Sequence, residues 1–320
     1  MSRPSVAVTG AAGFIGSRVL AQLRRDHPDW ELTGLDNFYR GEIREVAGIS
    51  IDHVDIRHRD QLADALAGVD AVVHLAALSG VESCADQPDL AYETNVVGTT
   101  NVAYLCKRAG TALVFPFSAA VLGDPTEFPI TTEMDREPLN WYGETKVLGE
   151  QAIETLAAGS FPAHQFLVAN LYGHHRIDGR RVSKDVVIDF FVDRALAGEP
   201  LTVYEPGTQA RNFVHVKDVA NAFCLSAERL VDARDRGETG SRAFELATEE
   251  APSVTEMAEL VARIAREERG LEPTVELVAN PREAETLVEE FTVDTTAVRE
   301  TLSWEPHHTV EATIREQLAE

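Results

Sequence analysis

The feature that most constrains the fold is a glycine-rich segment that directly follows the first apolar run of the chain. Residues 5–9 form this run, and Gly10, Gly13 and Gly16 follow it at three-residue spacing. A helical pattern begins near Phe14, within the same segment. A strand, a tight turn and a helix start in this order are the elements that hold the pyrophosphate of a dinucleotide. The segment therefore predicts a dinucleotide-binding α/β domain at the N-terminus.

Each of the three glycines has a distinct role in such a turn. Gly10 permits the tight turn, Gly13 lets the backbone approach the pyrophosphate, and Gly16 lets the helix and strand pack closely. The first turn of the helix presents free N–H groups and a positive dipole end to the phosphates. The cofactor site therefore extends to Phe14 and Ile15 at the start of the helix.

An acidic residue at the end of the second strand indicates which dinucleotide binds. Asp36 lies twenty residues beyond Gly16, where the apolar run 31–35 ends. Its carboxylate can accept hydrogen bonds from both ribose hydroxyls of NAD, and it would repel the 2′-phosphate of NADP. We therefore expect NAD to be the cofactor.

Strand and helix patterns alternate along the first half of the chain, which is typical of a doubly wound parallel sheet. The fold class is thus α/β, with a Rossmann-type sheet over residues 1–170 as the NAD-binding domain. After Asn170 the sequence becomes loop-rich, and residues 171–320 are expected to form a smaller α/β substrate-binding domain. Segments near 212–247 are expected to return to the first domain. A capping box that starts at Ser253 predicts a helix ending near Glu268.

The charge balance excludes several classes of partner. Asp and Glu number 53 against 29 Lys and Arg, for a net charge of −24, and only four of the cations are lysines. Such a surface repels nucleic acids and anionic membranes, so binding to either is not expected. An acidic surface with so few lysines resembles that of proteins from salt-loving organisms, in which molar salt screens the carboxylates.

Cysteine and histidine usage indicates neither disulfides nor a metal site. The three cysteines are widely separated, and the N-terminus shows no signal-peptide pattern, so a cytoplasmic protein without a disulfide framework is expected. No apolar stretch approaches the roughly 20 residues that a membrane span needs. Two histidine pairs, His174-His175 and His307-His308, are expected in surface or hinge roles.

A tyrosine and a lysine four residues apart form the candidate catalytic pair. Tyr142 and Lys146 lie within a predicted helix over 142–158, so that both side chains occupy one helix face. A phenol with its usual pKa of about 10 is a poor base at neutral pH. A nearby ammonium group lowers the phenol pKa, and the phenol can then exchange a proton with a substrate hydroxyl while hydride leaves the same carbon.

These motifs together resemble the short-chain dehydrogenase/reductase superfamily. Thr9 with the three glycines is similar to its turn, Asp55-Ile56 to the pair that holds the adenine, and 74–77 to the segment that lines the cofactor. His74 is expected to be a structural hydrogen-bonding residue. The resemblance also implies that Ser118, at the end of the strand over 112–117, orients the reacting group beside Tyr142. The implied cofactor-binding residues are Gly10, Gly13, Phe14, Ile15, Gly16, Asp36, Asn37, Asp55, Ile56, Leu75, Ala76, Ala77, Asn95, Tyr142 and Lys146.

The second half of the chain resembles the extended branch of this superfamily, the NAD-dependent epimerase/dehydratase family. Asn170 follows the sixth strand of the expected sheet, residues 209–219 are similar to a segment whose arginine grips a phosphate, and Ser303-Trp304-Glu305-Pro306 is similar to a terminal motif. Ser79 stands where galactose epimerases often carry lysine. The resemblance implies a nucleotide-sugar substrate and a homodimer formed by helices over 88–109 and 142–158. The implied substrate-binding residues are Ser79, Ser118, Asn170, Arg211 and Arg282.

Two alanines narrow the reaction. Sugar 4,6-dehydratases and decarboxylases of the family carry acidic residues near the positions of Ala119 and Ala120, so the acid–base pair for eliminating water is missing here. The resemblance then implies 4-epimerisation through a transient 4-keto sugar with NAD retained. Two alternatives stay open: an NAD-dependent dehydrogenase or reductase acting on a free aldose or nucleotide sugar, and an NAD-binding scaffold. A scaffold would not require the set of Ser118, Tyr142 and Lys146.

Overall fold

A single large sheet forms the centre of the molecule. The computed structural model describes residues 3–184, 186–281 and 287–319. The sheet has eight strands, of which seven are parallel, and only the short β3 pairs in antiparallel fashion, with β4. The α/β fold class predicted from the sequence is confirmed. In spatial order the strands are β13 (Gly240–Leu246), β7 (Pro162–Val168), β6 (Ala112–Ser118), β5 (Ala71–His74), β1 (Ser5–Thr9), β2 (Glu31–Asp36), β4 (Ile49–His53) and β3 (Glu45–Val46).

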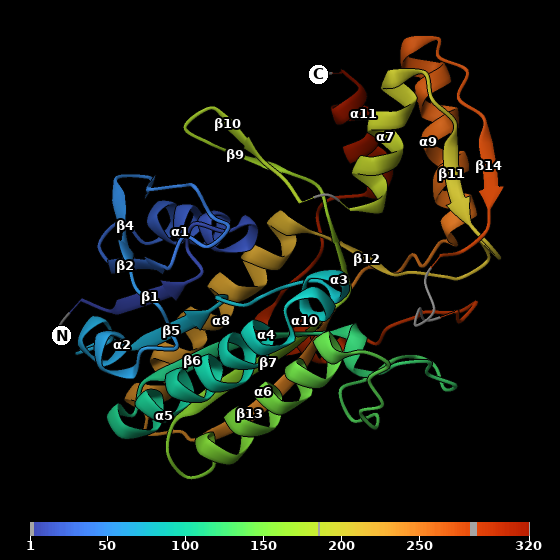
Figure 1. Cartoon of the computed structure of the whole chain (residues 1–320). Coiled ribbons are helices and arrows are strands. Elements are labelled where there is room, and N and C mark those ends of the chain that lie inside the picture. Colours follow the sequence, from blue (N-terminus) through green and yellow to red (C-terminus); the bar gives the residue numbers. More distant parts are fainter. Residues whose placement is uncertain (1–2, 185, 282–286, 320) are drawn as a thin grey trace.

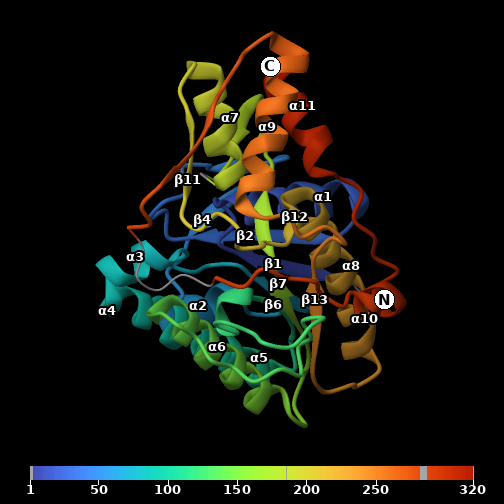
Figure 2. The ribbon, with the colours of Figure 1, turned by 90° about the vertical axis from the view of Figure 1, so that its right-hand side faces the viewer.

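Helices cover both faces of this sheet (Figures 1 and 2). One face is packed against α1 (Phe14–Asp26), α8 (Val216–Asp235) and α10 (Thr296–Leu302). The other face is packed against α2 (Arg59–Ala65), α5 (Thr99–Ala109) and α6 (Trp141–Ala157). The strands are apolar toward both faces because each face lies under a helical layer. Because seven of the strands are parallel, the residues that follow their carboxyl ends lie along one edge of the sheet.

The helical stretch over 88–109 is interrupted by a wider turn. It consists of α4 (Pro88–Ala91), a π-helical segment η1 (Tyr92–Gly98) and α5. A π-helical turn carries an extra residue and re-aims the side chains around it. Here the side chain in question is Asn95, which is buried against the loop that follows β5.

A smaller lobe lies beyond the carboxyl edge of the sheet (Figure 1). Its core is formed by α7 (Val187–Ala197), α9 (Val254–Arg269) and α11 (Val310–Ala319), together with the parallel pair β11 (Leu201–Tyr204) and β14 (Val275–Val278). The capping box predicted at Ser253 is present at the start of α9. Two more small sheets, β8 (Asn170–Tyr172) with β12 (Phe213–His215) and the hairpin β9 (His175–Ile177) with β10 (Arg180–Val182), join the lobes.

The chain passes between the two lobes more than once. It leaves the large sheet after β7, builds part of the smaller lobe, and returns through α8 to place β13 along the full length of β7. After α9 and β14, α10 packs against α8 and β13 before α11 ends in the smaller lobe. The division into a domain over 1–170 and a domain over 171–320 stays a prediction.

None of the helices in the described part of the chain is long and apolar enough to cross a membrane.

The acidic surface leads to a prediction about salt. Because a net charge of −24 repels itself in the folded state, and because salt screens exposed charges, we expect molar KCl to stabilise the fold. Raising KCl from about 0.1 to about 2 M should raise the Tm by about 5 °C or more in differential scanning calorimetry. An unchanged or lower Tm in molar KCl would refute the role assigned to the surface.

Candidate active site

The glycine-rich turn between β1 and α1 has no room for side chains at two of its positions. Gly10 has a φ of +71°, and a Cβ there would lie 2.6 Å from the backbone N of Ala76. A Cβ on Gly16 would lie 2.1 Å from the carbonyl O of Gly10. Gly13 is less constrained, because its Cβ would meet only the same carbonyl O, at 3.2 Å. The turn is therefore packed against the segment after β5, and Gly13 is the position left open to a ligand.

The Asp36 carboxylate is held in place at the end of β2 by two backbone N–H groups. Ala12 donates to Oδ2 at 3.0 Å, and Phe38 donates to Oδ1 at 2.7 Å. The side chain is mostly buried, so it lies fixed beside the glycine-rich turn. A carboxylate oxygen accepts more than one hydrogen bond, and both oxygens can still receive ribose hydroxyls.

Asp55 lies in a partly buried ion pair that the sequence pattern did not indicate. Arg57 donates to both of its carboxylate oxygens, at 3.0 and 2.7 Å, and Asn37 donates to Oδ2 at 3.2 Å. Burial would raise the pKa of Asp55, but the hydrogen bonds from Arg57 and Asn37 hold it well below its usual range. Ile56 is buried beneath, where a Cβ on Gly98 would overlap its side chain. The predicted residues Asn37, Asp55 and Ile56 thus adjoin one another.

The segment after β5 is fixed by buried polar side chains. The Oγ1 of Thr9 accepts from the backbone N–H groups of Leu75 and Ala76, both at 3.2 Å, and also contacts His74 Nδ1 at 2.7 Å. Burial lowers the pKa of His74 to about 3, so the ring is neutral and structural, as expected. Asn95 bonds both backbone groups of Leu78, at 2.8 and 2.9 Å. These contacts position the backbone through Ala77 that leads to Ser79.

Ser118, Tyr142 and Ser79 meet through hydrogen bonds. Ser118 closes β6 and caps the short helix η2 (Ala119–Val121), where its Oγ accepts from Ala120 N at 3.2 Å. Tyr142 lies in the first turn of α6, behind the N-cap Asn140. Burial raises the pKa of the Tyr142 phenol, while hydrogen bonds with the Ser118 and Ser79 side chains act in the opposite direction.

Lys146 completes the cluster from the next turn of α6. Its Nζ lies 5.9 Å from the centre of the Tyr142 ring and 5.2 Å from that of Phe115. Burial lowers the pKa of Lys146 to about 8. The ammonium form therefore still predominates at pH 7, next to the phenol, and favours the phenolate.

Two of the expected substrate-binding residues, Asn170 and Arg211, lie at the pair formed by β8 and β12. Asn170 begins β8, and its Nδ2 donates to the carbonyl O of Asn212, the residue after Arg211, at 3.2 Å. Arg211 donates from Nη1 to the carbonyl O of Ala210 at 2.8 Å. Arg282 lies outside the described residues. The structure thus places Asn170 and Arg211 side by side at the β8–β12 pair.

Two cations that were not among the predicted site residues bind Ser79. Lys184 donates from Nζ to Ser79 Oγ at 3.0 Å. Arg40 donates from Nη1 to the Ser79 carbonyl O at 3.2 Å. Lys184 follows β10 and Arg40 follows β2, so nothing in the local sequence pattern connects them with residue 79. The scarcity of lysine was the one available signal.

Of the surface or hinge roles predicted for His174 and His175, the surface role is wrong. Both side chains are buried. His175 contacts the carbonyl O of Phe14 through Nε2 at 2.8 Å and stacks on the Phe14 ring. The ring therefore ties the β9–β10 hairpin to the first turn of α1, beside the glycine-rich turn.

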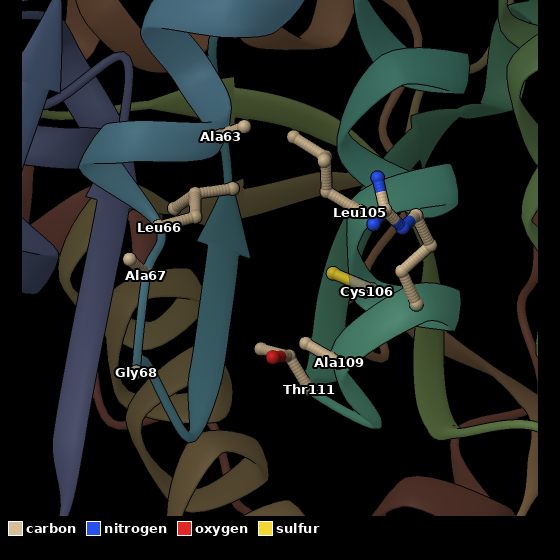
Figure 3. Close-up of a pocket in the computed structure, with 9 residues that line it drawn as sticks. Ala63, Leu66, Ala67, Gly68, Leu105, Cys106, Ala109 and Thr111 are labelled. Carbon is tan, nitrogen blue, oxygen red and sulfur yellow. The ribbon is translucent and has the colours of Figure 1, made fainter.

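A cavity of about 260 Å³ lies at the opposite edge of the sheet. Figure 3 shows it between α2 and α5. Gly68 and Thr111 in its lining precede β5 and β6, whereas Ser118 ends β6. Burial raises the pKa of Cys106, which also lines this cavity, to about 12, so the thiol is unreactive at neutral pH. The cavity is therefore separate from the cluster around Tyr142.

Comparison with known families places this architecture among enzymes. The model of the NAD dependent epimerase/dehydratase family matches residues 6–239. A UDP-glucose 4-epimerase of Halalkalibacterium halodurans is 30% identical over 81% of this chain and 80% of its own. A UDP-N-acetyl-alpha-D-glucosaminuronate decarboxylase of Bacillus cytotoxicus is 31% identical over 70% of this chain and 71% of its own.

Solved structures resemble the chain over nearly its full length. MoeE5 in complex with UDP-glucose and NAD has a TM-score of 0.80 at 28% identity, covering 98% of this chain and 97% of its own. UDP-glucose 4-epimerase of Thermus thermophilus in complex with NAD has a TM-score of 0.81 at 25% identity, covering 98% of both chains. The likeness extends through both lobes.

Proposed function

The chain belongs to the NAD-dependent epimerase/dehydratase family, and from this premise we propose that it is a nucleotide-sugar 4-epimerase. NAD is its cofactor, and it is an enzyme that modifies nucleotide sugars. The proposal of 4-epimerisation rests on the cluster of Ser118, Tyr142 and Lys146, which lies next to two alanines. This cluster can move a proton at a sugar hydroxyl, and it has no neighbouring carboxylate at residues 119 and 120.

The residues present fit NAD. A Cβ would fill the turn at Gly10 and Gly16, Gly13 stays open for a pyrophosphate, and Asp36 offers both carboxylate oxygens to ribose hydroxyls. The Lys146 ammonium, close to Tyr142, would hydrogen-bond the nicotinamide ribose. When bound, NAD supplies the exchange of hydride with the sugar carbon.

The protein side chains supply the proton chemistry. The Tyr142 phenolate takes the proton from the O4 hydroxyl of the sugar, and Ser118 Oγ hydrogen-bonds the same oxygen. With NAD bound to supply hydride exchange at C4, the 4-keto sugar would turn over in the pocket, and Tyr142 would return the proton to O4. Burial alone would keep the phenol protonated, so the Lys146 ammonium is needed to favour the phenolate at neutral pH.

Ala119 and Ala120 argue against elimination of water and against decarboxylation. The dehydratases and decarboxylases of this family carry acidic residues near these two positions, and those residues serve in acid–base steps. Here the backbone N–H of Ala120 instead holds Ser118 Oγ at 3.2 Å, and neither alanine side chain can exchange a proton. A retained carbon skeleton with inverted C4 is the outcome that this site supports best.

The proposal is tested by incubating the NAD-loaded enzyme in molar KCl with UDP-, dTDP- and GDP-sugars and with free aldoses. Sugars are resolved by chromatography or NMR while absorbance of NADH is followed. We expect a nucleotide sugar to interconvert with its 4-epimer without net NADH. Steady NADH formation from a free aldose would instead establish a dehydrogenase. Because a free aldose carries no diphosphate, Arg211 would then have no phosphate-binding role.

Asp36 is proposed to select NAD over NADP. The wild-type enzyme should bind NAD at least about 100-fold more tightly than NADP, because the 2′-phosphate would meet the fixed carboxylate. Asp36→Asn keeps one side-chain acceptor oxygen and removes the charge, so it should narrow this ratio about tenfold or more. Dissociation constants from fluorescence titration check this. Tighter binding of NADP by the wild type would exclude the role.

A homodimer is proposed through the α5–α6 layer. Tyr92, Val97, Tyr104 and Leu148 are large apolar side chains of this helical layer that are exposed in the single chain. Light scattering in molar KCl should give twice the chain mass, and Tyr104→Glu combined with Leu148→Glu should give the monomer, because two charges would be buried. A wild-type monomer would contradict the proposal.

A further inference from the structure

Ser79 is the meeting point of three chemical groups. Its Oγ accepts from Lys184 Nζ at 3.0 Å and shares a hydrogen bond with the Tyr142 phenol. Its carbonyl O accepts from Arg40 at 3.2 Å, and Arg40 also donates to Ser83 Oγ at 2.7 Å. The ammonium comes from the segment after β10 and the guanidinium from the segment after β2, so two distant parts of the chain bring positive charge to one residue.

This concentration of cations is unusual for the chain. Lys146 and Lys184 are two of its four lysines, in a molecule with a net charge of −24. Partial desolvation and the neighbouring Arg40 act to lower the pKa of Lys184, although its side chain stays open to solvent. An anion placed between the two cations would offset their mutual repulsion. Neutral sugar hydroxyls give no such compensation.

The position of Lys184 relative to the reacting carbon indicates which group of the substrate would supply the anion. Ser79 Oγ accepts from Lys184 Nζ at 3.0 Å, and the same side chain is close enough to the Tyr142 phenol to lower its pKa, so the ammonium and the phenol both adjoin one hydroxyl. In a hexopyranose whose O4 contacts Tyr142, the substituent on C5 lies two C–C bonds of about 1.5 Å each from C4. A group on C5 can therefore reach Lys184 while C4 stays at the phenol. The diphosphate lies further along the substrate, on the side of the anomeric carbon.

We propose that Lys184 is a specificity-determining residue that binds a carboxylate on C5 of the substrate sugar, so that the enzyme prefers a nucleotide-linked hexuronate. Lys184 Nζ contacts Ser79 Oγ, and Arg40 adds positive charge at the Ser79 carbonyl O. The ammonium group at this place thus belongs to Lys184, in the segment after β10, whereas galactose epimerases often carry a lysine at the position of Ser79 itself. This inference rests on the proposed function for the placement of C4.

Binding measurements test the proposal independently of turnover. Dissociation constants of UDP-glucuronate and UDP-glucose are measured by calorimetry with the NAD-loaded enzyme, at one fixed salt concentration. Lys184→Gln should weaken UDP-glucuronate about tenfold and UDP-glucose less than about twofold, because a charge-assisted hydrogen bond is lost only with the carboxylate. Lys107→Gln, which removes an exposed charge in the last turn of α5, is the matched control and should change neither.

An exchange variant separates a charge contact from a structural role. Ser79→Lys combined with Lys184→Ser moves the ammonium to the other side of the same contact and should restore most of the lost UDP-glucuronate affinity. Equal weakening of both ligands by Lys184→Gln would overturn the proposal, since it would indicate a phosphate contact or a structural effect. So would a wild-type enzyme that binds UDP-glucose as tightly as UDP-glucuronate. If the binding pattern holds but neither sugar is epimerised, the proposed reaction fails and the carboxylate site stands.

Discussion

Tyr142→Phe should lower kcat for epimerisation about 10³- to 10⁴-fold while NAD stays bound. The substitution removes only the phenol oxygen that exchanges the proton and leaves the ring, which lies 5.9 Å from Lys146 Nζ, in place. NAD is held mainly by the glycine-rich turn and Asp36, so its affinity should change less than about threefold. Steady-state kinetics with the substrate found in the sugar panel, together with NAD titration, gives both quantities.

Two comparisons make the Tyr142 result interpretable. Tyr104→Phe removes a phenol oxygen from the proposed dimer face of α5 but keeps the ring there, and it should leave kcat unchanged. Lys146→Met should shift the pH at which activity appears to higher values, because the phenolate loses the ammonium that favours it. More than a tenth of wild-type activity in Tyr142→Phe would assign the proton transfer to another group.

Gly16→Ala and Gly13→Ala should separate folding from cofactor binding. A Cβ on Gly16 would lie 2.1 Å from the Gly10 carbonyl O and 2.9 Å from Ala11 Cα, so backbone must move. We expect Gly16→Ala to lower the free energy of unfolding by about 3 kcal/mol, and the Tm by about 6–12 °C, with loss of NAD binding.

Gly13→Ala should leave the fold almost intact. Its Cβ would meet a single atom, at 3.2 Å, and we expect the Tm to change by less than about 2 °C. The methyl group would nevertheless occupy the surface that a pyrophosphate approaches, so NAD affinity should fall about 100-fold or more. Calorimetric unfolding and NAD titration of the two variants check this. Equal loss of stability in both would contradict the assignment of Gly13 to the ligand.

Local patterns predicted the parts of the fold that depend on neighbouring residues. The strand over 5–9 has the predicted bounds, and the helix expected from Phe14 begins there. Both follow from the apolar periodicity and the glycine turn, which are short-range signals. The pairing of Tyr142 with Lys146 was visible for the same reason, since residues four apart share a helix face.

The unpredicted parts depend on contacts between distant residues. The strands β8, β9 and β10 have three residues each, too few to show alternation, and they are defined by their partners instead. The approach of Lys184 to Ser79 joins positions 105 residues apart. The burial of His174 and His175 likewise follows from the packing of the hairpin against α1, which adjacent polar residues do not indicate.

The position of β13 has a consequence for synthesis on the ribosome. This strand ends at Leu246 and pairs with β7 over residues 162–168, which form a fully buried strand. Until Leu246 has left the exit tunnel, the nascent sheet ends in an open apolar edge that can pair with other chains. The dinucleotide fold is therefore completed only after β13 has been made, although its ligand-binding turn is translated long before that strand. A nascent chain that stalls between the two strands would be a substrate for chaperones.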